Sequence, residues 1–144
     1  MASKKRNWFW NSIAILTLLV CFIAFAVHYK NWTKISEDGI KMISGIYYKE
    51  LKFVSVDSVS LVDRIPPMQR LHGFSALSKG NGLYRHFKDS LSNKEVSVFV
   101  DNFEEQKIRI IYQDSLELFF NYSDSLKTTE LFTLLERKLY ISNE

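Results

Sequence analysis

A long uncharged segment near the N-terminus, Trp8 to Tyr29, constrains this chain more than any other part of its sequence. Its residues, WFWNSIAILTLLVCFIAFAVHY, include no Asp, Glu, Lys or Arg. As one helix at about 1.5 Å per residue, the segment would extend roughly 33 Å, which is enough to cross the hydrocarbon core of a bilayer. Aromatic residues mark both ends of it: Trp8, Phe9 and Trp10 at the first, Tyr29 and Trp32 at the second. Because such rings prefer the headgroup boundary, we expect a single-pass transmembrane helix at residues 8–29, in contact with the lipid bilayer.

A cleaved signal peptide is the alternative interpretation of the same segment. Ala24-Phe25-Ala26 has the small-x-small pattern that a signal peptidase recognises, and a basic start precedes the apolar residues. However, the apolar core from Ile13 to Val27 is already at the upper limit of a signal-peptide core, commonly about 7–15 residues. Trp8 to Trp10 lengthen it further. The length therefore favours a retained signal anchor over a secreted domain released by cleavage.

Basic residues on the two sides of the segment predict its orientation. Lys4, Lys5 and Arg6 precede it, whereas Lys30 and Lys34 follow it. Since basic residues favour the cytoplasmic side, this small excess predicts a cytoplasmic N-terminus at the cell membrane and a C-terminal domain outside the cytoplasm.

The same three residues before the helix account for the net charge of the chain. The whole sequence has 19 Lys and Arg against 16 Asp and Glu, so that removing Lys4, Lys5 and Arg6 leaves 16 of each sign. A nucleic-acid-binding protein normally carries its basic excess on the folded domain. The balanced charge after the helix therefore argues against nucleic acid as a partner.

The rest of the chain has the length of one domain. The only cysteine of the whole chain, Cys21, lies inside the hydrophobic segment, so the domain that follows contains no disulfide. We expect four regions: a basic tail at 1–7, a transmembrane helix at 8–29, a polar neck at 30–38 and a mainly-β domain at 39–144.

Alternating apolar and polar residues predict about seven short antiparallel strands in that domain. The alternating segments are, in chain order, 39–45, 46–53, 54–65, 83–88, 95–100, 107–112 and 116–120. A tight turn near Gly45 joins the first two. Met68 to Leu83 is the least regular part, and Lys79 to Gly82 within it contains an Asn-Gly turn signal. A polar turn is expected at Asp89 to Asn93.

The pattern changes to helical periodicity at the C-terminus. A helix at about residues 125–140 is predicted by leucines at spacings i, i+3, i+4 and i+8, namely Leu131, Leu134, Leu135 and Leu139. Asp124 or Ser125 can serve as its N-cap. The leucine face must be buried, so we expect this helix to cover the sheet.

The order of strands followed by one helix resembles the bacterial pleckstrin-homology (PH)-like domain family of membrane-associated proteins. The matching features lie between about residues 39 and 139: Arg70-Leu71-His72-Gly73-Phe74, Gly82-Leu83-Tyr84-Arg85, the strands Val96 to Val100 and Ile108 to Tyr112, and the helix start from Thr128 to Leu135. The resemblance implies a bent antiparallel sandwich or open barrel capped by the C-terminal helix. It also implies a binding or scaffolding module, and it supplies no shared catalytic residues.

A basic stretch from residue 64 to 88, which holds no Asp or Glu, is the candidate ligand-binding region. Its candidate residues are Arg64, Arg70, His72, Lys79, Arg85 and Lys88. Together on one face they would bind a lipid headgroup or a small anionic ligand. The simpler interpretation is that they scatter over several loops and faces as solvated charges, and the sequence favours it.

No catalytic or metal-binding motif accompanies these residues. His72 precedes Gly73-Phe74-Ser75, but no G-x-S-x-G sequence surrounds that serine. His72 and His86 also lack the spacing of metal ligands. We therefore expect a non-enzyme with no cofactor and no metal. Its predicted role is a membrane-anchored interaction or scaffolding module that recruits a protein partner at the cell envelope, with binding of a lipid headgroup or anionic ligand through residues 64–88 as the alternative.

Overall fold

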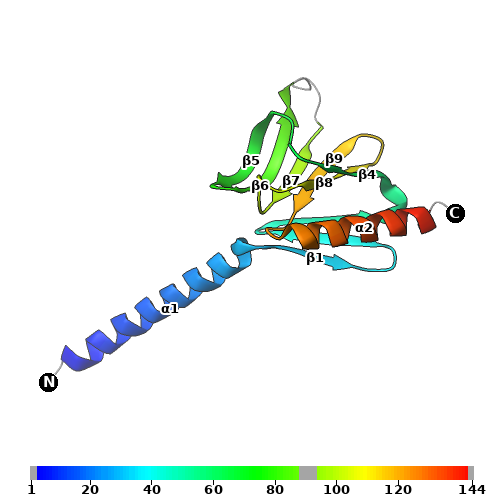
Figure 1. Ribbon diagram of the computed structural model, residues 1–144. Helices are drawn as coiled ribbons and strands as arrows, with labels where there is room; N and C mark the ends of the chain where they lie inside the picture. The colour runs from blue at the N-terminus through cyan, green and yellow to red at the C-terminus, as the bar shows by residue number, and fades with distance from the viewer. Residues whose placement is uncertain (1–2, 88–93, 143–144) are drawn as a thin grey trace.

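The computed structural model describes residues 3–87 and 94–142 of the chain. A helix, α1 (Ser3–Tyr29), projects from a mainly-β domain, and a second helix, α2 (Ser125–Ser142), packs on that domain (Figure 1). Within α1, the 20 residues Asn7–Ala26 are long and apolar enough to cross a membrane, and none of this segment is buried. As the sequence predicts, the N-terminal helix fits a transmembrane or signal anchor.

The described residues of the domain form nine strands in two sheets. The three-stranded sheet has the order β1 (Asn31–Ile35), β2 (Gly39–Ser44), β3 (Tyr47–Lys52). The six-stranded sheet has the order β4 (Val56–Val62), β8 (Lys107–Tyr112), β9 (Leu116–Asn121), β7 (Val96–Val100), β6 (Lys79–His86), β5 (Met68–Ala76). A short 3-10 helix, η1 (Phe53–Ser55), connects β3 to β4.

The main core lies between the small sheet, the large sheet and α2. It is formed by buried apolar residues of all three parts, among them Ile40, Met42, Ile108, Ile110, Phe120, Leu131 and Leu135. A second, smaller cluster lies on the opposite face of the large sheet around Val96, Val98 and Phe119. Every residue of β7 is buried, because this strand lies inside the sheet and contributes to both clusters.

The segment predicted as a polar neck, residues 30–38, contains strand β1. This strand pairs with β2 from Asn31 opposite Ser44 to Ile35 opposite Ile40. Sequence periodicity does not predict this strand, because its first residue, Asn31, is polar and is buried through hydrogen bonds to the rest of the domain. Only Lys30 separates α1 from β1.

The turn predicted at Lys79 to Gly82 is wrong. Strands β5 and β6 pair continuously through this segment, and the connection lies two residues earlier, at Leu77 and Ser78. Gly82 is paired with Gly73, and both have positive φ, 153° and 128°. A Cβ atom on Gly73 would lie 2.2 Å from the carbonyl oxygen of Asn81. These glycines therefore allow two strands to approach closely instead of forming a turn.

The strand count and direction also differ from the prediction of about seven antiparallel strands. Strands β7 and β9 are parallel, because the β8–β9 hairpin inserts β9 directly beside β7. The two strands that the sequence missed are β1 and β5. The strand predicted at 83–88 is the second part of β6, and the turn predicted at Asp89 to Asn93 lies outside the described residues.

The packing of α2 generates a stability prediction. Leu135 is 2% exposed in the main core, whereas Leu126 on the same helix is 73% exposed. Leu135→Ala should lower the free energy of unfolding by about 2–5 kcal/mol, through lost burial and the cavity that remains. Leu126→Ala, which removes the same atoms from an exposed site, should change it by less than about 0.5 kcal/mol. Chemical unfolding of the full chain in detergent, followed by circular dichroism, measures both; equal effects would exclude α2 from the cooperative core.

Candidate functional site

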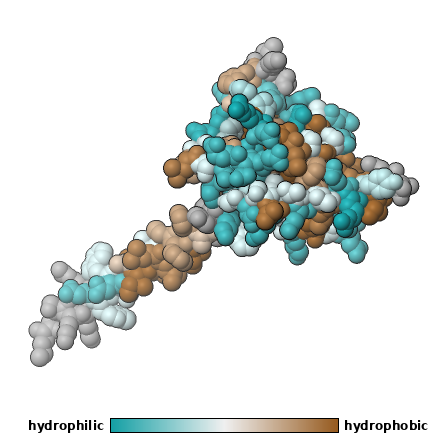
Figure 2. Space-filling view, viewed as in Figure 1, coloured by the Kyte–Doolittle hydropathy of each residue, from teal (hydrophilic) through white to brown (hydrophobic). Residues whose placement is uncertain are grey.

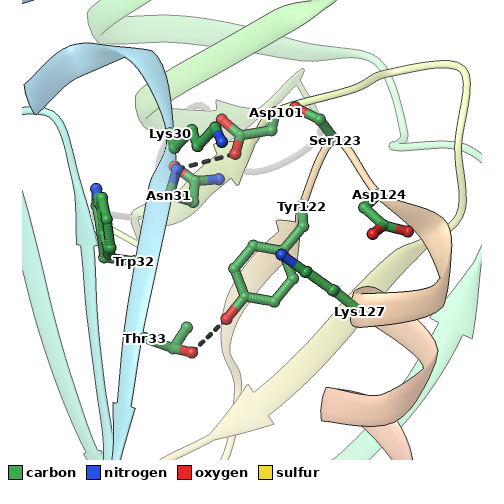
Figure 3. Close-up of a pocket in the computed structure, with 9 residues that line it drawn as sticks. All are labelled: Lys30, Asn31, Trp32, Thr33, Asp101, Tyr122, Ser123, Asp124 and Lys127. Atoms are coloured by element: carbon green, nitrogen blue, oxygen red, sulfur yellow. Dashed lines mark hydrogen bonds between the residues drawn. The ribbon is translucent and has the colours of Figure 1, made fainter. Parts of the chain in front are cut away.

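A cluster of polar side chains surrounds the point where α1 joins the domain (Figure 3). They line a cavity of about 320 Å³, which we call the junction pocket. Its lining residues come from the α1–β1 connection, strand β1, the residue after β7, the β9–α2 loop and the first turn of α2: Lys30, Asn31, Trp32, Thr33, Asp101, Tyr122, Ser123, Asp124 and Lys127.

Asn31 is the centre of this cluster and is 4% exposed. Its backbone N–H donates to Oδ2 of Asp101 at 2.8 Å. Its side-chain Nδ2 donates to the carbonyl oxygens of Phe99 at 2.8 Å and Asn121 at 3.0 Å. Its Oδ1 accepts from the Ser44 hydroxyl at 2.5 Å. Because these partners belong to or adjoin β2, β7 and β9, one side chain fixes the start of β1 against both sheets.

Asn121 holds the loop that follows β7 and thereby positions Asp101. The Oδ1 atom of this fully buried residue accepts from the backbone N–H groups of Asp101 at 2.9 Å and Asn102 at 3.1 Å. Its Nδ2 donates to the carbonyl oxygens of Asn102 at 2.6 Å and Gln106 at 3.1 Å. All hydrogen-bonding positions of this amide are therefore used inside the domain.

Asp101 contributes a buried carboxylate to the wall of the pocket and is 3% exposed. Its Oδ2 accepts from the backbone N–H of Asn31. Its Oδ1 lies 3.8 Å from Nζ of Lys79 and has no hydrogen-bond partner among the described residues. Burial raises the pKa of Asp101 above its ordinary value, although the Asn31 N–H and the Lys79 charge oppose this shift.

The opposite wall of the pocket connects β1 to the start of α2. The hydroxyl groups of Thr33 and Tyr122 share a hydrogen bond, and burial raises the pKa of Tyr122. The backbone N–H of Tyr122 donates to Oγ1 of Thr128 at 3.1 Å. Asp124 caps the helix, since its Oδ1 accepts from the N–H of Leu126 at 3.0 Å. This confirms the predicted N-cap and ties α2 to the same junction.

The side chains of the junction pocket form hydrogen bonds that hold β1, the end of β7 and the start of α2 together. Its lining residues supply hydroxyl, amide, lysine and carboxylate groups but include no histidine or cysteine. Among the described residues, no group of three or more His, Cys, Asp or Glu side chains is placed to hold a metal ion.

The structure separates the basic residues predicted as a ligand site. Arg70 and His72 lie on β5, and Lys79 and Arg85 lie on β6. Arg64 lies in the connection between β4 and β5, and Lys88 is outside the described residues.

Strand pairing shows which of these residues share a face. Arg70 pairs with Tyr84, but the register shifts after it, so that His72 pairs with Leu83. Arg70 and His72 therefore point to opposite faces of the hairpin, and His72 lies on the face of Lys79 and Arg85. Lys79 and Arg85 share one face but are six residues apart along β6, which is roughly 20 Å in a strand. Lys79 lies beside Asp101 at the junction.

The sequence did not identify Asn31, Asp101 and Asn121 as site residues. Two of them carry a recognisable signal, because Asp101 and Asn121 each follow directly after a run of buried strand residues, 96–100 and 118–120. A polar residue at the buried end of a strand needs hydrogen-bond partners. The identity of those partners depends on the tertiary structure.

Comparison of the chain with protein-family models, with curated proteins and with solved structures gives no match.

The Asn31 network generates a second stability prediction. Asn31→Ala should lower the free energy of unfolding by about 1–3 kcal/mol, because it leaves the Ser44 hydroxyl and two buried carbonyl groups without their partner. Asn102→Ala is the matched control, since the one hydrogen bond that its side chain makes within the described part of the chain is exposed, with Oδ1 accepting from the N–H of Glu104 at 3.0 Å. Chemical unfolding of both variants, alongside the unaltered chain, tests this; a control variant as unstable as Asn31→Ala would contradict it.

The raised pKa of Asp101 generates a pH prediction. A carboxyl group with a raised pKa in the folded state binds more protons there than in the unfolded state, so the stability it contributes falls as pH rises past its ordinary value. Asp101→Asn removes this dependence. The stability of that variant relative to the unaltered chain should therefore increase between about pH 3 and about pH 7. Thermal unfolding of the variant and of the unaltered chain across this range measures it; a stability difference that stays constant with pH would contradict the prediction.

Proposed function

We propose that this protein is a membrane-anchored, non-catalytic interaction module that recruits a protein partner at the cell envelope. The observation that carries this proposal is the open edge of β5. The order of strands followed by a terminal helix supports a PH-like module through resemblance alone, and the parallel β7–β9 pair departs from the antiparallel sandwich which that resemblance implies.

Strand β5 is the outermost strand of the six-stranded sheet and pairs only with β6 among the described residues. The opposite edge of this sheet, β4, is contacted by α2. An open strand edge presents unpaired N–H and C=O groups, to which an extended segment of another protein can add as a further strand. With nine residues, β5 is long enough for such pairing.

The side chains of β5 favour a protein segment over a small anion. Gln69, Arg70 and His72 are all exposed on this strand. Because Arg70 and His72 point to opposite faces, one headgroup or phosphate cannot readily contact both. An extended segment running along the edge passes both side chains, and their basic character suits an acidic partner.

The junction supports the scaffolding part of the proposal. Since α1 continues into β1 through Lys30 alone, and Asn31 is fixed by buried hydrogen bonds, the domain has no flexible tether. A partner bound at β5 would be held at a defined height and orientation relative to the membrane. The proposed orientation places the N-terminus in the cytoplasm and the domain outside it.

Site-specific photo-cross-linking in native membranes tests the proposal. A photoreactive residue at Gln69 on the open edge should trap a partner protein, whereas one at Ser58 on β4, exposed in the same sheet, should not. In the purified complex, amide hydrogen exchange should slow along β5 and stay unchanged along β4. Equal cross-linking at both sites, or exchange in β5 unaffected by the partner, would overturn the proposal.

A further inference from the structure

We propose that a ring of exposed apolar residues around the end of α1 contacts the headgroup region of a phospholipid bilayer, so that the domain lies directly against the membrane. This inference rests on α1 spanning a membrane, which is part of the proposed function. We call the ring the apolar collar; it consists of Trp32, Ile43, Ile46, Tyr48, Phe74 and Leu77, all of them exposed.

One side of the collar is a row across the three-stranded sheet. Trp32 pairs with Ile43, and Ile43 pairs with Tyr48, so the three side chains lie side by side on one face. Their neighbour Met42 points to the opposite face, into the main core. Trp32 is three residues beyond the end of α1, which places its backbone within about 11 Å of the helix.

The other side of the collar is made by two turns that the junction holds close to α1. Ile46 lies in the β2–β3 turn, two residues after Ser44, whose hydroxyl donates to Asn31. Leu77 lies in the β5–β6 turn, two residues before Lys79, which is 3.8 Å from Asp101. Asp101 in turn accepts from the backbone N–H of Asn31.

Phe74 closes the collar between these two turns. It lines a cavity of about 420 Å³ together with Ile46 and Tyr47, so the tip of β5 lies beside the β2–β3 turn. Figure 1 shows both turns on the side of the domain where α1 joins it, and Figure 2 shows hydrophobic residues at the surface on this side.

The bilayer is the occupant that the geometry favours, because the apolar collar is continuous with the proposed membrane span. The apolar segment of α1 ends at Ala26, and only residues 27–30 separate it from β1. At about 1.5 Å per helical residue, the domain begins within roughly 6 Å of the end of that segment. There is no spacer that could hold the collar away from the headgroups.

The chemistry of the collar residues also fits this location. Trp and Tyr side chains prefer the membrane–water interface, and burying aliphatic side chains there removes apolar surface from water. Lys30 and Lys34, both exposed beside the collar, suit the phosphate groups of the lipids.

Fluorescence quenching with the full chain in phosphatidylcholine–phosphatidylglycerol vesicles tests the proposal. With Cys21 replaced by alanine, an environment-sensitive fluorophore is attached to Leu77→Cys, to Ile46→Cys as a second collar site, or to Val54→Cys as the control. Val54 is a matched control because it is also highly exposed, at 82% against 104% for Leu77. It lies at the distal end of the small sheet, where the N–H of the preceding Phe53 bonds to the carbonyl of Asp38 in the β1–β2 turn.

Lipids that carry a quencher near the headgroup should quench the Leu77 and Ile46 probes several-fold more strongly than the Val54 probe. Equal quenching of collar and control probes would overturn the proposal. So would collar probes shielded from both lipid-borne quencher and aqueous iodide, because a protein or a second copy of the chain would then cover them.

A probe on the native Cys21 separates this inference from the anchor itself, because Cys21 lies within the segment Asn7–Ala26 and is the only cysteine of the chain. If acyl-chain quenchers reach Cys21 but headgroup quenchers do not reach Leu77, the anchor stands and the collar is wrong. If Cys21 is not quenched, α1 does not span the bilayer and both proposals fail.

Discussion

The buried hydrogen bonds of Asn31 are the constraint on which the rest of this structure depends. Asn31 is the second residue after α1, and its backbone and side chain bond to Phe99, Asp101 and Asn121, which are 68 to 90 residues away in the sequence. A buried amide left without partners costs free energy, so the chain cannot bend at this point without breaking the network. The direction in which α1 leaves the domain is thereby coupled to the core.

The arrangement of strands and helices around this junction determines where the two proposed contact surfaces lie. At the junction, β1, the β2–β3 turn and the β5–β6 turn gather around the end of α1, and their tips expose large apolar residues. From the junction, α2 runs across β4 and η1, which leaves β5 as the uncovered edge of the six-stranded sheet. The proposed membrane contact and the proposed partner edge thus follow from the same arrangement.

Several charged side chains in the domain are compensated by oppositely charged side chains close to them. Lys79 compensates the buried Asp101 at the junction, and Arg109 bonds to Glu117 at 2.7 Å across β8 and β9. A register shift between Arg70 and His72 places Arg70 on one face of the β5–β6 hairpin, and the strand pairing places His72, Lys79 and Arg85 on the other. The basic residues that are consecutive along β5 are therefore divided between two faces of the hairpin, which is the physical reason for favouring an extended partner over a single anion.

The sequence by itself determined those elements whose signal is local: the apolar helix, the strands at 96–100, 107–112 and 116–120, and the leucine face of α2. Hydrophobic periodicity specifies such elements without reference to the rest of the chain. Only the tertiary structure decided that residues 31–35 form a strand, that Gly73 and Gly82 face each other across a hairpin, and that β9 lies parallel to β7. Each of these depends on hydrogen bonds or close approaches between strands that local periodicity does not encode, because the atoms that satisfy a backbone or amide group can come from anywhere in the chain.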